Sequence, residues 1–260
     1  MREDKELLLE AAREVAEALV EAGGNAFVFT GAGVSTESGI PDFRGPSGLW
    51  RRIPPEKFTI EYFHANPLEV WRLYSELYRS MSGAKPNEAH YAIARLEALG
   101  LIQGVVTQNI DGLHQAAGSR NVIELHGSGS RAVCLECGFT DSIERWLVKV
   151  AGGVLPRCPV CGGLMKPAAV FFGEELPREA LRRAFDLAHA ARVVIVVGSS
   201  LTVYPAALVP EEAARRGARL YIVNLGETSL DWMAEIVVRA RAGSFLPLVV
   251  GEAERLLGRG

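Results

Sequence analysis

The chain has 260 residues, of which 48% are hydrophobic and 23% charged, and it carries a net charge of −3 at pH 7. This length suits one large domain, or one domain with a smaller insertion, and the composition is typical of a globular protein. The weakly acidic balance gives no basic surface for nucleic acid, so direct nucleic-acid binding is not expected. No secretory signal and no apolar run of membrane-spanning length are visible, so we expect a cytoplasmic protein without a membrane partner.

The apolar positions predict helices and strands that alternate along most of the chain. Helices are expected at residues 3–22, 67–81, 86–100, 177–189 and 205–216, and at the carboxyl terminus. Strands are expected at residues 26–30, 101–107, 122–125, 193–197 and 220–223. Because these strands are continuous apolar runs, they predict a parallel sheet that helices cover on both faces.

The loop that follows the first predicted strand is rich in glycine and polar residues. Its Gly31-x-Gly33 turn suits a close approach of backbone N–H groups to a phosphate. Thr36 stands where the usual dinucleotide-binding pattern has its third glycine, and Gly39 and Pro41 would interrupt a long helix. The loop therefore predicts a phosphate-binding turn that continues into an irregular segment, although many such glycine patterns are merely tight turns.

Polar or glycine residues follow five of the predicted strands, at the end where parallel sheets bind ligands. They are Gly31 to Ser35, Gln108 to Asp111, His126, Gly198 to Ser200, and Asn224. Each has a structural alternative: His126 could be a hydrogen-bonded histidine without a catalytic role, and Asn109 and Asp111 could cap a following helix. Their joint occurrence at five strand ends favours a ligand site.

The four cysteines form two Cys-x-x-Cys pairs, Cys134 with Cys137 and Cys158 with Cys161, with twenty residues between the pairs. Neighbouring glycines and a proline favour tight turns, which let both thiolates of a pair face one ion. The pattern predicts a zinc ion bound by four cysteines, which is structural because no coordination position stays open. Two disulfides or two redox-active dithiols are the alternatives.

Taken together, the motifs resemble those of the sirtuin family of NAD-dependent protein-lysine deacylases. They are Gly31 to Arg44, Thr107 to His114, Leu125 to Ser128, the two cysteine pairs, Val170 to Glu174, and Gly198 to Leu201. The resemblance covers nearly the whole chain and implies an α/β fold, with a Rossmann-like parallel sheet and a small inserted domain. It implies an NAD-binding domain of residues 1–44, 83–131 and 167–260, and a small domain built from a helical excursion at 45–82 and a zinc ribbon at 132–166.

The resemblance also implies that NAD is a co-substrate bound at the strand ends. The residues that it places on NAD are Gly31, Ala32, Gly33, Ser35, Ile40, Asp42, Phe43, Arg44, Gln108, Asn109, Ile110, Asp111, Gly198, Ser199, Ser200, Asn224, Leu225, Gly226 and Ala242. Within this set the Gly31 to Ser35 turn would hold the diphosphate, and Asn224 would contact the adenosine ribose. Asp111 would bind the nicotinamide carboxamide, and Phe43 would shield the reactive ribose.

By the same resemblance, the acyl group of a modified lysine is transferred to ADP-ribose, and nicotinamide is released. His126 would act as general base on a ribose hydroxyl, while Asn109 would position ribose hydroxyls and a water. The residues that would bind the acetylated lysine of a protein or peptide substrate are Val170, Phe172, Gly173, Glu174 and Tyr74.

The acyl preference follows from one departure from a family pattern. Sirtuins that prefer succinyl- or malonyl-lysine carry a Tyr-x-x-Arg pair, but here Leu77 follows Tyr74 at the arginine position. A buried substrate carboxylate without that cation would be costly, so acetyl-lysine or a longer neutral acyl group is expected. Two other functions stay open: mono-ADP-ribosyl transfer at the same site, and a zinc-ribbon interaction module with a degenerate nucleotide pocket.

Overall fold

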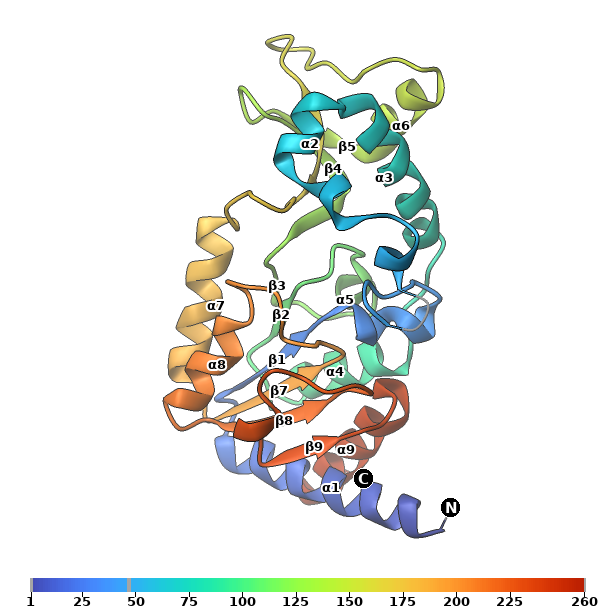
Figure 1. Cartoon of the computed structure of the whole chain (residues 1–260). Coiled ribbons are helices and arrows are strands. Elements are labelled where there is room, and N and C mark those ends of the chain that lie inside the picture. Colours follow the sequence, from blue (N-terminus) through green and yellow to red (C-terminus); the bar gives the residue numbers. More distant parts are fainter. Residues whose placement is uncertain (1, 46–47, 260) are drawn as a thin grey trace.

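The computed structural model describes residues 2–45 and 48–259 and contains a six-stranded parallel sheet (Figure 1). In spatial order the strands are β3 (Val122–Glu124), β2 (Val105–Thr107), β1 (Ala26–Thr30), β7 (Val193–Val197), β8 (Arg219–Val223) and β9 (Ile236–Val238). The chain builds one half of the sheet outward from β1 and then the other half outward from β7, which is the strand order of a Rossmann fold. The predicted parallel sheet is confirmed.

Helices cover both faces of this sheet, as the continuous apolar strands predicted. The first face carries α1 (Arg2–Ala22), α4 (Glu88–Ala98) and α9 (Ala242–Leu256), and the second carries α7 (Arg178–Ala190) and α8 (Leu208–Arg215). Successive side chains of a strand point to opposite faces, so Val28 joins the first core while Phe27 and Phe29 join the second. Among the described residues, no helix has the length and apolar character that a membrane crossing requires.

A second, antiparallel sheet of three strands lies at the other end of the molecule with three helices (Figure 1). Its elements are β4 (Gly127–Cys134), β5 (Thr140–Ser142), β6 (Met165–Ala169), α2 (Ile60–Ala65), α3 (Pro67–Ser82) and α6 (Ile143–Ala151). Trp71 of α3 and Trp146 of α6 are fully buried in one cluster with Cys134 and Met165. The Trp71 indole N–H also donates to the Met165 carbonyl at 2.9 Å. The helical excursion and the cysteine segment therefore share one hydrophobic core.

Short helical turns complete the described chain. They are η1 (Ala32–Ser38), η2 (Leu49–Arg51), η3 (Pro55–Phe58), α5 (Leu113–Ala116) and η4 (Asp231–Met233). The strand expected at 101–107 begins only at Val105, after Gly104 adopts a φ of +157°. Strands β4, β5, β6 and β9 and helices α2 and α6 were not predicted individually. The short η1 turn is closed by Gly39 in the left-handed conformation, so the described part of the loop after β1 contains no long helix, as expected.

Candidate active site

A cavity of about 860 Å³ lies at the carboxyl ends of the parallel strands, between the large sheet and the small antiparallel sheet with its helices. The loops after β1, β2, β7 and β8 contribute to its wall, together with α3, η3 and the segment after β6. Every residue that the sequence analysis placed on NAD, in catalysis or on the acyl-lysine lines this one cavity. The structure therefore brings the predicted site residues together, while their individual roles stay predictions.

The loops after β1 and β7 cross each other, and two glycines make this crossing possible. The Gly33 amide donates to the Gly198 carbonyl at 2.8 Å. Gly198 has a φ of +63°, and a Cβ on it would lie 2.2 Å from the Val34 nitrogen. A Cβ on Gly33 would lie 2.8 Å from the Gly198 Cα. Both glycines are required by the close approach of two backbones at the point where the strand order reverses.

Ser35, Asn109 and Asp111 form a hydrogen-bonded group in the cavity wall. The Ser35 hydroxyl donates to Asp111 Oδ2 at 2.7 Å, and the Asn109 amide donates to Ser35 Oγ and to the Gly31 carbonyl, each at 3.2 Å. Asp111 Oδ1 also accepts from the Leu113 N–H at 3.0 Å, so the helix-capping role considered for Asp111 is present as well. These bonds hold the side chains in fixed positions before any ligand binds.

His126 has one ring nitrogen bound to the backbone and the other unprotonated. Its Nδ1 lies 2.9 Å from the Gln108 carbonyl oxygen. A carbonyl can only accept, so Nδ1 carries the proton and the neutral ring leaves Nε2 as an acceptor. Burial lowers the pKa of His126 below its ordinary value, and the bond to Gln108 partly opposes this shift. The ring is therefore neutral at pH 7 and can accept a proton in the cavity.

Two buried histidines, His90 and His114, lie behind this group. His114 Nε2 lies 2.9 Å from Thr30 Oγ1, which donates to Thr107 Oγ1 at 2.8 Å, and Thr107 accepts from the Asn109 N–H at 3.0 Å. Burial lowers the pKa of His114 to about 3, with a smaller effect from neighbouring His90. No role for these histidines could be predicted from the sequence, because their burial and partners arise only in the folded chain.

Further polar contacts join the loops after β2, β7 and β8. Gln108 Nε2 donates to Ser199 Oγ at 2.8 Å, and Ser199 Oγ also accepts from the Leu201 N–H at 3.2 Å. Asn224 Nδ2 donates to the Gly226 carbonyl at 2.8 Å, which orders the loop after β8. We use the name polar half for Ser35, Gln108, Asn109, Asp111, His126 and Ser199, which line one part of the cavity.

Aromatic rings line the other part of the cavity. The centre of the Trp50 ring lies 5.0 Å from that of Phe43, 5.8 Å from Phe58 and 6.1 Å from Phe172. Phe58 and Phe171 meet edge to face with their centres 5.9 Å apart. These five residues form the aromatic half of the cavity, and they join the loop after β1 to the segment after β6. Trp50 was not assigned a role from the sequence, because nothing in its local pattern shows that it lies between Phe43 and Phe172.

Tyr74 has its hydroxyl bound within the protein. It is 1% exposed, and its hydroxyl donates to the Gly129 carbonyl at 3.0 Å. Leu77 and Met81 continue the cavity wall along the same helix, and Ile110 packs against them. This part of the wall is apolar, so it suits an uncharged group better than a charged one.

Several further residues line the cavity without having been assigned from the sequence. They include Glu37, Trp50, Met81, Tyr204 and Arg241. The Glu37 carboxylate accepts from the Gly243 N–H at 2.8 Å, in the first turn of α9, where a negative charge is favoured. This contact joins residues that are 206 positions apart, so the sequence contains no local sign of it.

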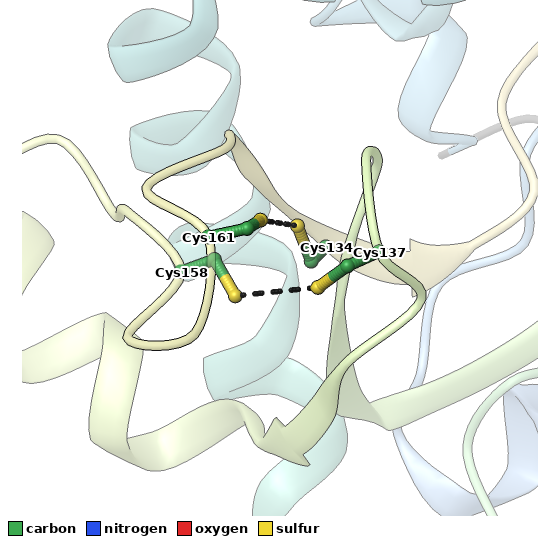
Figure 2. A group of neighbouring side chains, drawn as sticks. All are labelled: Cys134, Cys137, Cys158 and Cys161. Atoms are coloured by element: carbon green, nitrogen blue, oxygen red, sulfur yellow. Dashed lines mark hydrogen bonds between the residues drawn. The ribbon is translucent and has the colours of Figure 1, made fainter.

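The four cysteines meet as the predicted metal site requires (Figure 2). All four sulfur atoms lie within 4.8 Å of one another; Cys134 is 3.5 Å from Cys161, and Cys137 is 3.7 Å from Cys158. A tetrahedral zinc with Zn–S bonds of about 2.3 Å separates its sulfurs by about 3.8 Å, whereas a disulfide needs about 2.05 Å. The donor set and spacing therefore fit zinc and do not fit either disulfides or isolated dithiols.

Comparison with known proteins shows similarity to one family over almost the whole chain. Residues 31–205 match the model of the Sir2 family. The NAD-dependent protein deacetylase 1 of Pyrobaculum aerophilum is 51% identical over 244 residues, which cover 94% of this chain and 95% of that protein. The NAD-dependent protein deacylase of Pyrococcus abyssi is 46% identical over 96% of this chain and 100% of its own length.

Solved structures agree with this assignment. A Sir2–p53 peptide–NAD+ complex has a TM-score of 0.86 and 43% identity, covering 93% of this chain and 98% of that one. The Sir2Tm protein bound to a propionylated peptide has a TM-score of 0.84 and 41% identity over 95% of this chain and 98% of that one. The chain therefore belongs to the Sir2 family, the sirtuins.

Proposed function

We propose that this NAD-dependent protein-lysine deacylase uses His126 as its general base and binds the acyl-lysine against the aromatic half of its cavity. One observation carries the proposal. A neutral histidine with a fixed tautomer shares a single cavity with the polar group of Ser35, Asn109 and Asp111 and with an apolar wall. The names of the relatives, and the NAD+ and peptides bound by the solved neighbours, support the same activity.

The polar half is assigned to NAD. We assign the diphosphate to the crossing loops at Gly31 to Ser35 and Gly198 to Ser200, because they meet at the switch point of the sheet. Gln108 to Asp111 are assigned to the nicotinamide and its ribose, with Ile40 to Arg44 covering them. The loop from Asn224 to Gly226 and Ala242 are assigned to the adenosine end.

His126 is assigned to proton transfer. When bound, NAD supplies the ribose carbon that accepts the acyl oxygen and the nicotinamide that leaves. His126 Nε2 takes a proton from a ribose hydroxyl, since Nδ1 is held by the Gln108 carbonyl and the ring is neutral. Asn109 orients a water or hydroxyl group; its own amide is held by Ser35 and Gly31. A base held in this way contributes about 10²–10⁴-fold to the rate.

The aromatic half, apart from Phe43, is assigned to the substrate lysine together with the neighbouring apolar wall. Val170, Phe172 and Gly173 are exposed to the cavity along an extended segment, which suits the addition of a peptide strand. Leu77 and Met81 favour a neutral acyl group, and the Tyr74 hydroxyl is already bound to Gly129. We therefore assign acetyl-lysine, or a longer neutral acyl-lysine, as the substrate group.

The packing supports a division of the chain into two domains. We assign residues 1–44, 83–131 and 167–260 to the NAD-binding domain, and 45–82 with 132–166 to the small domain, because the excursion and the ribbon share one core. Zinc held by the four cysteines would stabilise that core without contacting the substrate. We place the protein in the cytoplasm, where thiolates stay reduced for zinc. Its net charge of −3 gives no reason to expect nucleic acid as a partner.

A coupled assay tests the proposed function. The protein is incubated with NAD and an acetyl-lysine peptide, and mass spectrometry counts the nicotinamide and the free lysine formed. We expect equal amounts of both, no reaction without NAD, and loss of both products in His126→Ala. Nicotinamide release without deacetylation would favour ADP-ribosyl transfer instead, and no reaction from folded, zinc-containing protein would contradict the deacylase assignment.

A further inference from the structure

Lys166 is a buried cation next to the aromatic half of the cavity. It belongs to β6 and is 3% exposed. Its ammonium group has three N–H donors and three oxygen partners: the Pro167 carbonyl at 2.9 Å, the Ala169 carbonyl at 2.6 Å and Glu174 Oε2 at 3.0 Å. It also lies 4.1 Å from the centre of the Phe171 ring. Burial lowers the pKa of Lys166, and the Glu174 carboxylate opposes this shift.

Glu174 completes a clamp on one edge of the segment from Pro167 to Phe172, which consists of the end of β6 and the residues after it. Its Oε2 accepts from the Phe171 N–H at 2.7 Å while it pairs with Lys166. The backbone groups held by the two side chains belong to residues 167, 169 and 171, which point to the same edge of an extended chain. The Lys166–Glu174 pair therefore replaces a neighbouring strand along this edge.

The opposite edge of the segment is tied to the catalytic side of the cavity. The Val170 N–H donates to the His126 carbonyl at 2.8 Å, and the Phe172 N–H donates to the Phe58 carbonyl at 2.9 Å. Ile60 N–H donates in turn to the Phe172 carbonyl at 2.9 Å. Phe172 itself is 41% exposed and lines the cavity. The position of Phe172 relative to His126 thus depends on how this segment is held at both edges.

This ion pair is expected to contribute little net stability compared with apolar residues of the same size, because Lys166 loses its hydration and the Glu174 side chain keeps only 21% of its exposure. Such a pair is better explained by the geometry that it imposes. We propose that Lys166 is a positioning residue for acyl-lysine binding: with Glu174, it holds the segment from Pro167 to Phe172 at the spacing from His126 that the substrate requires. The proposal rests on the proposed deacylase function, and it makes Glu174 act through the Phe171 backbone instead of through the peptide.

Three variants test this role: Lys166→Met, Glu174→Gln and the double variant. Affinity for a fluorescein-labelled acetyl-lysine peptide is measured by anisotropy without NAD, and affinity for ADP-ribose by calorimetry. We expect each single variant to weaken peptide binding by about tenfold and to leave ADP-ribose binding within about a factor of two. The double variant is expected to bind the peptide as well as the single variant with the lower peptide affinity, because both residues act through one clamp.

Lys149→Met is the matched control. Lys149 also lies over an aromatic ring of the small sheet and its helices, 4.6 Å from the centre of Trp146, but it is exposed and does not line the cavity. We expect its peptide affinity to equal that of the wild type. If Lys166→Met does not fold, Glu174→Gln, which keeps its size, decides the question by the same readout.

Two results would overturn the proposal. Peptide affinity that stays unchanged in folded variants would leave the pair with a structural role only. Losses that add in the double variant would show that Glu174 contacts the peptide directly. A wild-type protein that binds the peptide and ADP-ribose but forms no product would contradict the proposed deacylase function alone, since the binding measurements do not depend on turnover.

Discussion

The two halves of the cavity are built on different physical principles. In the polar half, directional hydrogen bonds link Ser35, Asn109 and Asp111, and His126 is fixed by the Gln108 carbonyl. In the aromatic half, the rings around Trp50 pack at tilted angles without directional bonds. The energy of a hydrogen bond falls steeply when one of its atoms is displaced, whereas packed rings can shift with a smaller loss of energy. The polar half should therefore be sensitive to substitution, whereas the aromatic half should accept conservative changes of ring.

The origin of the two halves differs as well. The polar half follows from the parallel sheet, whose strand ends converge at the crossing of Gly33 with Gly198. The aromatic half depends on the small antiparallel sheet and its helices, whose core contains Cys134 and Cys158. Loss of the metal should consequently damage the two halves unequally, which allows them to be separated by experiment.

The largest effect is expected from removal of zinc. Binding of a structural zinc is worth about 10–16 kcal/mol in small zinc domains, and here it would hold the core around Trp71 and Trp146. We expect chelation, or Cys134→Ala, to change the fluorescence of these buried tryptophans and to abolish peptide binding. Zinc content and tryptophan emission are measured together, and the control is recovery after zinc is restored. Full deacylation by the zinc-free protein would refute the structural role.

The next largest effect is expected from the general base. His126→Ala should lower kcat by about 10²–10⁴-fold while ADP-ribose and peptide affinities stay within about a factor of two. Steady-state kinetics and calorimetry measure the two quantities. His189→Ala is the matched control, because His189 lies on α7 next to Glu212 and does not line the cavity. Lost ADP-ribose affinity in His126→Ala would mean that His126 acts in binding instead.

A smaller effect is expected from pH. Burial lowers the pKa of His90, His114 and His126 below 6.5, so in acid the unfolded chain binds more protons than the folded one. Stability should therefore be complete above pH 6.5 and fall as the pH drops from 6.5 towards the folded-state pKa, about 3 for His114. The slope is at most about 1.4 kcal/mol per pH unit for each histidine.

Thermal unfolding at pH 7.5, 5.5 and 4.5 measures this slope. His114→Gln should reduce it, because one of the buried histidines no longer titrates. The activity should also decrease as the pH falls, since only neutral His126 accepts a proton. We expect kcat/KM to fall at a pH below 6.5. An acid limb above pH 6.5 would contradict the burial of His126.

The smallest effect concerns the acyl group. Leu77→Arg places a cation in the apolar wall beside Tyr74, where it can pair with a substrate carboxylate. The ratio of kcat/KM for succinyl-lysine to that for acetyl-lysine should rise by about tenfold, and no further, because the Tyr74 hydroxyl stays bound to Gly129. Leu77→Met is the neutral control. An unchanged ratio would mean that the acyl group does not reach Leu77.

Much of the polar half could be predicted from the sequence, because its residues directly follow the strands. Continuous apolar runs such as Val193 to Val197 are recognisable without tertiary information, and the sheet places their ends at one edge. The cysteine spacing likewise predicted a cluster that the structure contains. The local sequence pattern was sufficient to predict a site residue where its distance along the chain from a strand end, or from another cysteine, determines its position in the fold.

The rest depends on contacts between distant segments. Strand β9 has three residues at the sheet edge, too few for a periodic signal, and α6 lies inside the cysteine segment. The sequence around Trp50 and Lys166 gives no sign of a role in the site. Their roles follow from the contacts of Trp50 with Phe172 and of Lys166 with Glu174 in the folded chain. Gly31 and Gly33 were explained from the sequence by a close approach to phosphate, whereas the structure adds a backbone contact between Gly33 and Gly198.

The division of the cavity is tested most directly by dissociation constants for two ligands in two variants. ADP-ribose and an acetyl-lysine peptide are titrated into Ser199→Ala, which removes the partner of Gln108, and into Phe172→Ala, which removes an aromatic wall. We predict that Ser199→Ala weakens ADP-ribose alone by about tenfold and that Phe172→Ala weakens the peptide alone by a similar factor. Equal weakening of both ligands in either variant would contradict the assignment of NAD and acyl-lysine to separate halves.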